Sequence, residues 1–504
     1  MVSAVKSNPM SSSTPTSSSQ EKHPAGLGVL FFTELWERFS FYGMRALAIL
    51  FMTSELKFSD PKSYGIYGAY GALVWASPII GGYIADHFLG ARRAIFMGGL
   101  IIAAGHFTLA LPIENSLFYG LAFLVVGTGF FKPNISSLLG QLYRQNDPRR
   151  DGGFTIFYMG INIGAFIAPI LCGYVAHNYG WHAGFGLAGI GMLLGLLTLY
   201  FGRKSLGDAG HPPMLAVDKK VSSLGNYTNV FLIVAAILTI PVFSYALQNN
   251  EGLSNILQIF GFVAFGSVII RAFKAEAEDR RRMLSLLLLF PFFMSYFACL
   301  EQSGGSMNLF AERNVDRMIG SFEFPTAWTQ SMNPLFIMLL APIFSWGWNL
   351  LAKNNLEPVT PVKFGFGLFT TGLGFYALIL GIKAADSQGM VHFGWLTGAY
   401  FLITAGELMI SPIALSMVTK LSPARFVSYM MGALFLAQSY SHLIAAGVSK
   451  AFSMESGKDL ATDKLASLGV FSHIFEFTLY FSMAFGVAAF LVTPFVRKTL
   501  KKYN

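Results

Sequence analysis

The feature that most constrains the fold of this chain is a succession of apolar segments, each about 20 residues or longer, joined by short polar connections. A segment of that length is long enough to cross a bilayer as a helix. We predict fourteen of them, near residues 25–54, 64–87, 92–112, 117–143, 153–177, 181–201, 226–247, 254–273, 282–311, 327–352, 359–382, 392–420, 424–449 and 466–496. Charged residues make up only 12% of the chain, about half their share in soluble domains. The sequence therefore predicts an all-α polytopic membrane protein.

Basic residues lie mainly in the connections that follow the even-numbered segments, for example Arg92, Arg93 and Arg203. The opposite connections, such as 112–116 and 177–181, contain almost none. Because Lys and Arg accumulate in cytoplasmic loops, we expect both termini to be cytoplasmic. The net charge of +9 comes from cations in the short connections between segments. It does not predict nucleic-acid binding, because no basic patch is interleaved with aromatic residues.

The first apolar segment contains four charged residues, and each costs about 2.5–3.5 kcal/mol in a spanning helix. They are Glu34, Glu37, Arg38 and Arg45, and with Tyr42 they recur at spacings of three or four residues. Such spacing places them on one face of a helix. We interpret this face as lining a buried polar site, with an ion-pair cluster that only fixes helix packing as the alternative.

Further polar residues interrupt later segments, several of them beside a proline or glycine. These are Lys132, Asn162, Glu301, Asn333 and Glu407. Together with the first segment they give four carboxylates and three cations. The carboxylate in excess is expected to bind a proton readily, because a desolvated charge without a partner is unfavourable.

The cations lie in the first half of the chain, and two of the carboxylates, Glu301 and Glu407, lie in the second. This polarity predicts a ligand with a negative and a positive end, that is, a zwitterion. The alternative, salt bridges between two halves of the protein, is compatible with it if those bridges break when substrate binds. We interpret His106, the histidine that the sequence places deep in a segment, as a satisfied packing residue, with a proton carrier as the less favoured alternative.

The stretch from Gly82 to Arg93 has the pattern G-x-x-x-D-x-x-x-G-x-R-R, formed by Gly82, Asp86, Gly90, Arg92 and Arg93. This pattern resembles the loop motif of the major facilitator superfamily. There, small residues let helices approach closely and the aspartate pairs with arginine at the cytoplasmic gate. The resemblance implies two six-helix bundles with the substrate site between them.

Two segments exceed that plan, and we interpret 226–247 and 254–273 as an inserted hairpin that acts as a spacer. The expected organisation begins with a disordered cytoplasmic tail (1–24) and an N-terminal bundle (25–202). A linker with the hairpin (203–281), a C-terminal bundle (282–497) and a second cytoplasmic tail (498–504) follow.

The first segment, Glu34-x-x-Glu37-Arg38-Phe39-x-x-Tyr42-Gly43, resembles the signature of the proton-coupled oligopeptide transporters, a branch of that superfamily. Further family motifs are matched by Phe131-Lys132-Pro133-Asn134, Phe157-Tyr158-x-x-Ile161-Asn162-x-Gly164, Asn333-Pro334-Leu335-Phe336 and Gly406-Glu407-Leu408-x-x-Ser411. The likeness covers nearly the whole chain after the tail. The chain lacks the large extracellular domain of animal members, so the resemblance is to bacterial members of the inner membrane.

The resemblance implies a role for each buried polar residue. Arg45 and Lys132 would receive the peptide carboxylate, and Asn162, Asn333 and Glu407 would hold the α-amino group. Proton coupling would involve Glu34, Glu37, Arg38 and Glu301, the last exchanging partners between Arg45 and the substrate. The expected substrate contacts are Tyr42, Arg45, Trp75, Lys132, Asn162, Phe297, Glu301, Asn333, Glu407, Ser411 and Leu434.

Three of these positions depart from the pattern of bacterial members. Phe297 and Leu434 stand where tryptophans are common, and Trp75 stands where a pocket tyrosine is found. Because these positions shape the side-chain pockets, the preference for particular peptides cannot be transferred from relatives.

The function predicted is symport of di- and tripeptides with protons, by a lipid-embedded monomer that needs no cofactor or metal and binds no nucleic acid. The nearest alternative is the same fold carrying nitrate or a peptide-like drug, and a receptor that does not transport remains a further one. An enzyme is disfavoured because the sequence contains neither H-E-x-x-H nor G-x-S-x-G. Cys172 and Cys299 both lie within predicted segments, so no disulfide framework is expected.

Overall fold

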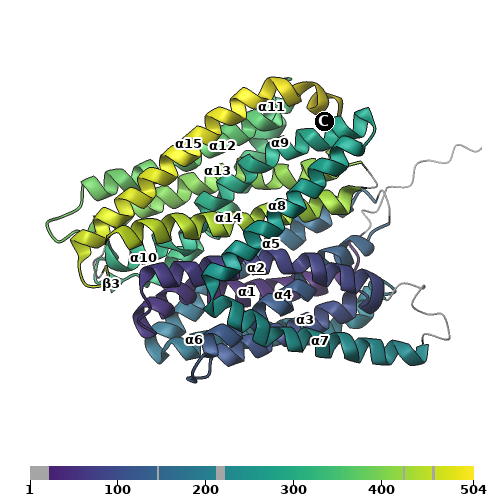
Figure 1. Cartoon of the computed structure of the whole chain (residues 1–504), viewed down its shortest axis with the longest axis horizontal. Helices are drawn as coiled ribbons and strands as arrows, with labels where there is room; N and C mark the ends of the chain where they lie inside the picture. Colours follow the sequence, from purple (N-terminus) through teal and green to yellow (C-terminus); the bar gives the residue numbers. More distant parts are fainter. Residues whose placement is uncertain (1–21, 145–146, 212–221, 424–425, 457–459, 504) are drawn as a thin grey trace, which may run out of the picture.

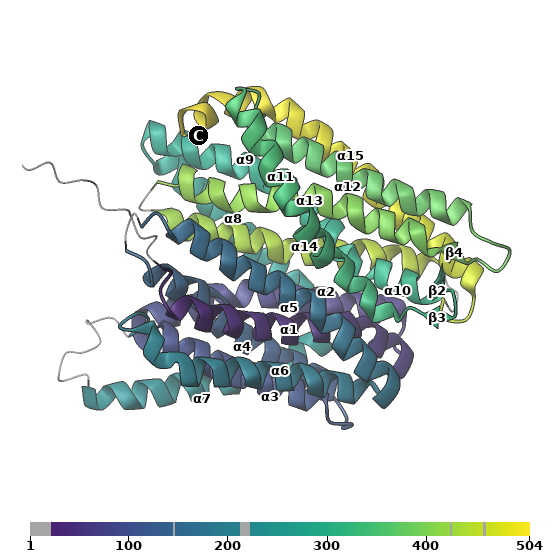
Figure 2. The same ribbon diagram turned by 180° about the vertical axis from the view of Figure 1, so that it is seen from behind.

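The structure is a computed structural model that describes residues 22–144, 147–211, 222–423, 426–456 and 460–503. Its helices form two bundles that lie side by side, with the N-terminal half of the chain in one and the C-terminal half in the other (Figures 1 and 2). The predicted N-terminal tail lies almost entirely outside the described residues.

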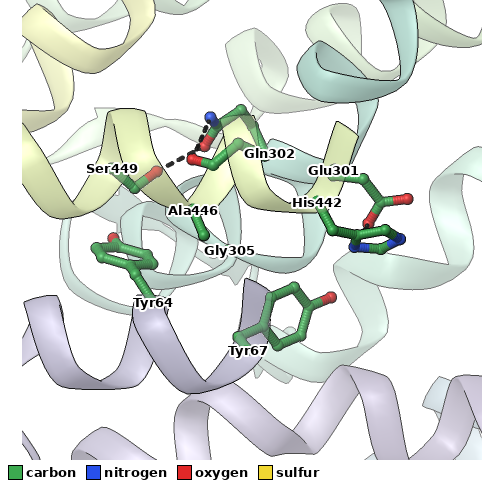
Figure 3. Close-up of a pocket in the computed structure, with 9 residues that line it drawn as sticks. Tyr64, Tyr67, Glu301, Gln302, Gly305, His442, Ala446 and Ser449 are labelled. Atoms are coloured by element: carbon green, nitrogen blue, oxygen red, sulfur yellow. Dashed lines mark hydrogen bonds and ion pairs between the residues drawn. The ribbon is translucent and has the colours of Figure 1, made fainter. Parts of the chain in front are cut away.

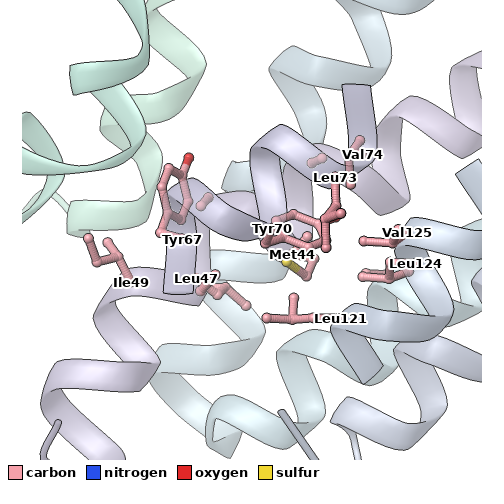
Figure 4. Packing of buried hydrophobic residues seen from close by; sticks show 14 of the residues in the cluster. Met44, Leu47, Ile49, Tyr67, Tyr70, Leu73, Val74, Leu121, Leu124 and Val125 are labelled. Carbon is pink, nitrogen blue, oxygen red and sulfur yellow. The ribbon is translucent and has the colours of Figure 1, made fainter. Parts of the chain in front are cut away.

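The N-terminal bundle packs α1 against α5 and α6, and packs α4 against α2 and α3. Its helices are α1 (Gly26–Leu50), α2 (Asp60–Ile84), α3 (Ala91–Leu109), α4 (Ser116–Gln141), α5 (Arg150–Tyr179) and α6 (Trp181–Gly202). Figure 4 shows how apolar side chains fill the space between three of them, with Met44 of α1 lying between Tyr70 of α2 and Leu121 of α4. This packing holds the charged face of α1 in a fixed position.

The hairpin consists of α7 (Ser222–Gln248) and α8 (Asn250–Lys274). Helix α7 lies against α4 of the N-terminal bundle, whereas α8 packs on α9 and α14 of the C-terminal bundle. The hydroxyl of Tyr440 on α14 donates hydrogen bonds to two backbone carbonyls of α8, those of Leu257 and Gln258. The hairpin predicted from the sequence is therefore present, and it contacts both bundles.

The C-terminal bundle contains α9 (Ala277–Leu300), α10 (Ser306–Arg313), α11 (Met332–Lys353), α12 (Thr360–Lys383), α13 (Phe393–Leu421), α14 (Val427–Glu455) and α15 (Lys464–Tyr503). A 3₁₀ turn at Glu301–Gly304 joins α9 to α10, so these two helices form one interrupted crossing. The described chain thus has the fourteen helical segments that the sequence predicts.

Two predicted boundaries differ from the structure. Helix α9 begins at Ala277, before the expected boundary at residue 282, because Glu278 and Asp279 favour its first turn. Helix α15 continues to Tyr503, through most of the segment predicted as a C-terminal tail.

Ten helices of the described chain are long and apolar enough to span a membrane on length and composition alone. Helix α1 falls outside this set because it contains four charged residues. The charged face is therefore the feature of α1 that requires an explanation.

Four short strands, absent from the sequence prediction, lie at one end of the molecule. β1 (Val315–Asp316) pairs in parallel with β4 (Val391–His392), and β2 (Met318–Ile319) pairs with β3 (Phe322–Glu323) in an antiparallel turn. We call this the outer end, and we call the opposite end, where α15 finishes, the inner end (Figures 1 and 2).

Candidate functional site

The charged residues of α1 form a compact cluster with Lys132 of α4. Arg38 donates through Nε and Nη2 to the two carboxylate oxygens of Glu37. Lys132 Nζ donates to Glu34 Oε1 at 3.0 Å, and Arg38 Nε lies 3.6 Å from that same oxygen. Glu34, Glu37 and Arg38 are buried. The cluster therefore holds two carboxylates and two cations within the N-terminal bundle.

A second ion pair joins the two bundles. Arg45 of α1 donates through Nη2 to Glu301 Oε2 at 2.9 Å and through Nε to the hydroxyl of Tyr67 at 2.9 Å. Its guanidinium carbon lies 5.9 Å from the ring centroid of Tyr42. Glu301 lies in the 3₁₀ turn between α9 and α10, so the break in this crossing places its carboxylate opposite α1.

The fourth carboxylate lies in the C-terminal bundle without a cation. Asn333 of α11 donates to Glu407 Oε2 of α13 at 2.8 Å and to Thr404 Oγ1 at 3.1 Å. Glu407 is buried, with 9% of its surface exposed, and no ion pair among the described residues involves it. The structure thus identifies Glu407 as the excess carboxylate that the sequence count leaves unassigned.

Two further predicted contacts, Asn162 and Ser411, are not joined to these ion pairs. Asn162 donates at 3.0 Å to the backbone carbonyl of Tyr158 on its own helix, α5. Ser411 lies one turn beyond Glu407 on α13, and its hydroxyl has no hydrogen-bond partner among the described residues. The asparagine and serine are therefore not engaged by the other polar residues of the site.

The three positions that depart from the family pattern differ in exposure. Trp75 is partly buried and lies 6.3 Å, between ring centroids, from Phe435. Phe297 is also partly buried, and its ring centroid lies 4.6 Å from that of Phe293, with the two rings tilted at 47°. Leu434 is buried in the core of the C-terminal bundle. In this conformation Leu434 is not available for contact with a substrate.

The loop motif is only partly arranged as its resemblance implies. Gly82 lies against Pro133 of α4, and Gly90 has a φ of +74° at the turn into α3, a conformation that glycine adopts without strain. In the described part of the chain Asp86 forms no ion pair, and Arg92 donates instead to the carbonyl of Gly207. The pairing of aspartate with arginine is absent from this conformation.

The outer end of the interface is closed by buried polar contacts. Arg313 of α10 donates to both carboxylate oxygens of Asp60 on α2, at 2.6 and 2.7 Å, and each residue is less than a tenth exposed. Asn308 donates to the carbonyl of Ala46 at 3.2 Å, and Trp328 donates to that of Ile170 at 2.9 Å. Toward the inner end α15 tilts away from the N-terminal bundle (Figures 1 and 2). The structure therefore represents an outer-closed conformation.

The sequence analysis missed three contacts of the interface between the bundles. Tyr67 is the second acceptor of Arg45, Asp60 is the partner of Arg313, and His442 lies 3.3 Å from Glu301. Tyr67 gave no signal for a site in the sequence, because its helix, α2, carries few charges. His106 was the histidine expected deep in the fold, yet His442 is buried as well and is the one beside an ion pair.

Two helical bundles with buried charges on facing helices define a membrane transporter by class. Comparison with known sequences identifies the family. The model of the POT family matches residues 92–464. The chain therefore belongs to the POT family of proton-coupled peptide transporters, a family of transporters and not of enzymes.

Curated relatives are similar over almost their whole length. The chain is 37% identical over 447 residues to a di-/tripeptide transporter of Lactococcus lactis subsp. cremoris, covering 85% of this chain and 90% of the relative. It is 33% identical over 489 residues to dipeptide and tripeptide permease A of Escherichia coli (strain K12), covering 96% and 93%.

Solved structures of the family share the fold. A peptide transporter POT in complex with sulfate has a TM-score of 0.79 at 36% identity, over 95% of this chain and 96% of that one. A POT family transporter in complex with 5-aminolevulinic acid has a TM-score of 0.80 at 30% identity, over 94% and 96%.

Proposed function

We propose that this chain imports di- and tripeptides together with protons by alternating access. The zwitterionic peptide lies between Arg45 and Lys132 on one side and Glu407, Asn162 and Asn333 on the other. Protons couple through Glu34, Glu37, Arg38 and Glu301. Named peptide transporters among the relatives support the substrate class.

The observation that carries this proposal is that both cations for the peptide carboxylate are already occupied. Glu301 holds Arg45 and Glu34 holds Lys132, each at 3.0 Å or less. A peptide carboxylate must displace one of these glutamates, and a displaced buried carboxylate without a cation is strongly unfavourable. Protonation of the glutamate removes that cost, so peptide binding and proton binding favour each other.

The positive end of the peptide is accommodated differently. Glu407 has a hydrogen bond from Asn333 but no cation among the described residues, so an α-amino group can take the vacant place without displacing anything. The seven charged residues of the proposed site sum to −1, and a zwitterion adds no net charge. One proton therefore brings the loaded site to neutrality, which is the state that crosses the low-dielectric interface most readily.

The same argument separates peptides from the nearest alternative substrate. Nitrate has no positive end, so it leaves Glu407 without a cation. 5-Aminolevulinic acid, which is present in one related structure, is itself a zwitterion and fits the same arrangement. Zwitterions are therefore favoured over simple anions.

Orientation follows from the basic residues. Arg92 and Arg282 lie near the starts of α3 and α9, Arg149 directly precedes α5, and Arg203 directly follows α6. These helix ends lie at the inner end, where α15 also finishes. We infer that the inner end faces the cytoplasm of a bacterial cell, with both termini there and the protein in the inner membrane. One chain supplies both halves of the site, so we infer that a monomer is sufficient for transport.

The test is uptake of labelled dialanine into liposomes that contain the purified protein, with an inward proton gradient and a negative interior. We expect accumulation that a protonophore abolishes, that other dipeptides and 5-aminolevulinic acid reduce, and that nitrate and free alanine leave unchanged. Folded protein that accumulates no dipeptide would overturn the proposal.

A further inference from the structure

His442 of α14 lies at the ion pair that joins the two bundles, yet it has no part in the mechanism above. Its side chain is 6% exposed, and Nδ1 is 3.3 Å from Glu301 Oε2. That same oxygen accepts the hydrogen bond from Arg45 Nη2 at 2.9 Å. Figure 3 shows the imidazole directly beside the Glu301 carboxylate, with the Tyr67 hydroxyl pointing toward both. Glu301 therefore lies between a permanent cation and a group that can become one.

The imidazole is otherwise unpartnered, although it is buried. Neither ring nitrogen forms a hydrogen bond to any of the described residues. A buried polar side chain without a partner costs free energy, so its presence beside Glu301 calls for an explanation. The charged and titratable groups that face it are Glu301 from the 3₁₀ turn, Arg45 from α1 and Tyr67 from α2.

The surrounding helices make room for this side chain. On α2, a Cβ atom added at Gly71 would lie only 2.2 Å from His442 Nδ1, so no other residue fits there without a shift. A cavity of about 10 Å³ adjoins the ring and is lined by Tyr64, Tyr67, Glu301 and Gln302, among others (Figure 3). This is about the volume that one water needs, and the polar lining can hold that water. The cavity can therefore place one water beside the imidazole.

We propose that His442 is a protonation site at the ion pair that joins the two bundles. Its imidazolium replaces Arg45 as the counter-ion of Glu301. This inference rests on the proposed function and deepens it, because it names the residue that takes up a coupled proton. In the outer-closed structure Arg45 holds Glu301 across the interface between the bundles. Proton binding to the imidazole gives Glu301 a second cation at the same oxygen.

The position of His442 determines what this exchange does. Arg45 belongs to the N-terminal bundle, whereas His442 and Glu301 both belong to the C-terminal bundle. The exchange therefore converts an ion pair between the bundles into one within a bundle. Arg45 becomes free to bind the peptide carboxylate. Of the two ion pairs that join the bundles in the described structure, only that of Arg313 with Asp60 is left. Loss of the proton toward the cytoplasm reverses both changes.

The chain provides a matched control in His106 of α3. It too is buried, and both of its ring nitrogens lack a hydrogen-bond partner among the described residues. No ion pair of the described chain includes it. The same substitution at the two positions therefore separates the loss of a buried imidazole from the loss of the proposed counter-ion.

The experiment compares wild type, His442→Asn, His442→Gln and His106→Asn in proteoliposomes. Two readouts are measured for dialanine: accumulation driven by a gradient of one pH unit, and counterflow exchange at equal pH, which needs no net proton movement. We expect both His442 variants to retain counterflow and to lose about tenfold in accumulation, which is the gradient that one proton supports per pH unit. The dependence of their uptake on pH should be weaker than that of wild type. His106→Asn should behave like wild type.

Accumulation and a pH profile like those of wild type in both His442 variants would overturn the proposal. So would equal loss of accumulation and counterflow in both variants when they are folded, since this would indicate a purely structural role. Wild-type vesicles that accumulate no dialanine would instead overturn the proposed peptide function, and this inference with it.

Discussion

The cluster around Glu34 and the pair formed by Arg45 and Glu301 are both buried carboxylate–cation contacts, but they differ in which bundles they join. The first links α1 to α4 within the N-terminal bundle, and the second links α1 to the turn after α9 across the interface. Protonation of Glu34 therefore changes the charge of the site and leaves the bundles in contact. Protonation at Glu301 or His442 changes the charge and also loosens the interface.

This difference suggests two kinds of contact. The first kind binds substrate, and the second kind holds the protein in one conformation. The outer pair of Asp60 and Arg313 belongs entirely to the second kind, because it lies beyond the site, close to the strands. Under the proposed function Glu407 belongs entirely to the first kind, because it has no cation to release in the described structure. The pair of Arg45 and Glu301 belongs to both.

The largest effect is expected where a contact only holds a conformation. Arg313→Met leaves Asp60 buried without a cation and should destabilise the outer-closed state by about 3–5 kcal/mol. A shift of that size moves most of the population to another conformation. Distances between spin labels at Leu111 and Leu465, both exposed at the outer end, should lengthen in the variant.

The control for this prediction is the exchanged pair, Asp60→Arg with Arg313→Asp. It keeps one carboxylate and one guanidinium across the same interface, so the label distances should return toward those of wild type. Unchanged distances in Arg313→Met would show that the pair does not hold the outer end closed.

The next largest effect is expected where a contact only binds substrate. Glu407→Gln removes the charged acceptor for the peptide amine, and a hydrogen bond to a charged group contributes about 1.5–3 kcal/mol. Dialanine affinity should fall by about 10–150-fold. N-acetyl dialanine, which has no amine charge, should bind the variant and wild type equally well. A loss of the same size for both ligands would contradict the role of Glu407, and the label distances should remain those of wild type.

Much of this comparison could be predicted from the sequence. Hydropathy and helical spacing were sufficient for the fourteen segments and for the charged face of α1, because both depend on residues that are close in the chain. The count of charges correctly predicted one carboxylate in excess. These features need no knowledge of how helices pack.

Partners that are distant in the chain could not be predicted in the same way. Asp60 and Arg313 are 253 positions apart, and nothing in either local sequence indicates the other. The choice of Glu407 as the unpaired carboxylate depends on which helices face each other, and so does the difference between His442 and His106. The sequence also offered no signal for the four short strands, each of which is two residues long.

A smaller effect is expected for the carboxylate that changes charge within one bundle. Glu34→Gln leaves Lys132 without its ion-pair partner, so peptide carboxylate can bind there without a proton. Accumulation in a gradient of one pH unit should fall by about tenfold, while counterflow persists. The label distances at the outer end should not change, in contrast to Arg313→Met. Full retention of proton dependence in both Glu34→Gln and Glu37→Gln would exclude this cluster from coupling.

The smallest effect is expected at Asp147, in the connection between α4 and α5 outside the membrane-spanning helices. Hydrogen bonds from the side chain and backbone of Arg149 lower the pKa of this carboxyl from 3.8 to about 2. A lowered pKa means that the ionised form stabilises the fold at pH values above 3.8, and that this contribution is lost as the pH falls toward about 2. Asp147 therefore stays ionised at neutral and mildly acidic pH. Asp147→Asn should leave the pH profile and extent of dialanine uptake unchanged, and should lower the melting temperature slightly at neutral pH but not near pH 2. A shifted pH profile would mean that proton coupling extends to the connection between α4 and α5. It would remove the distinction between a coupled site inside the bundles and ion pairs that only fix a loop.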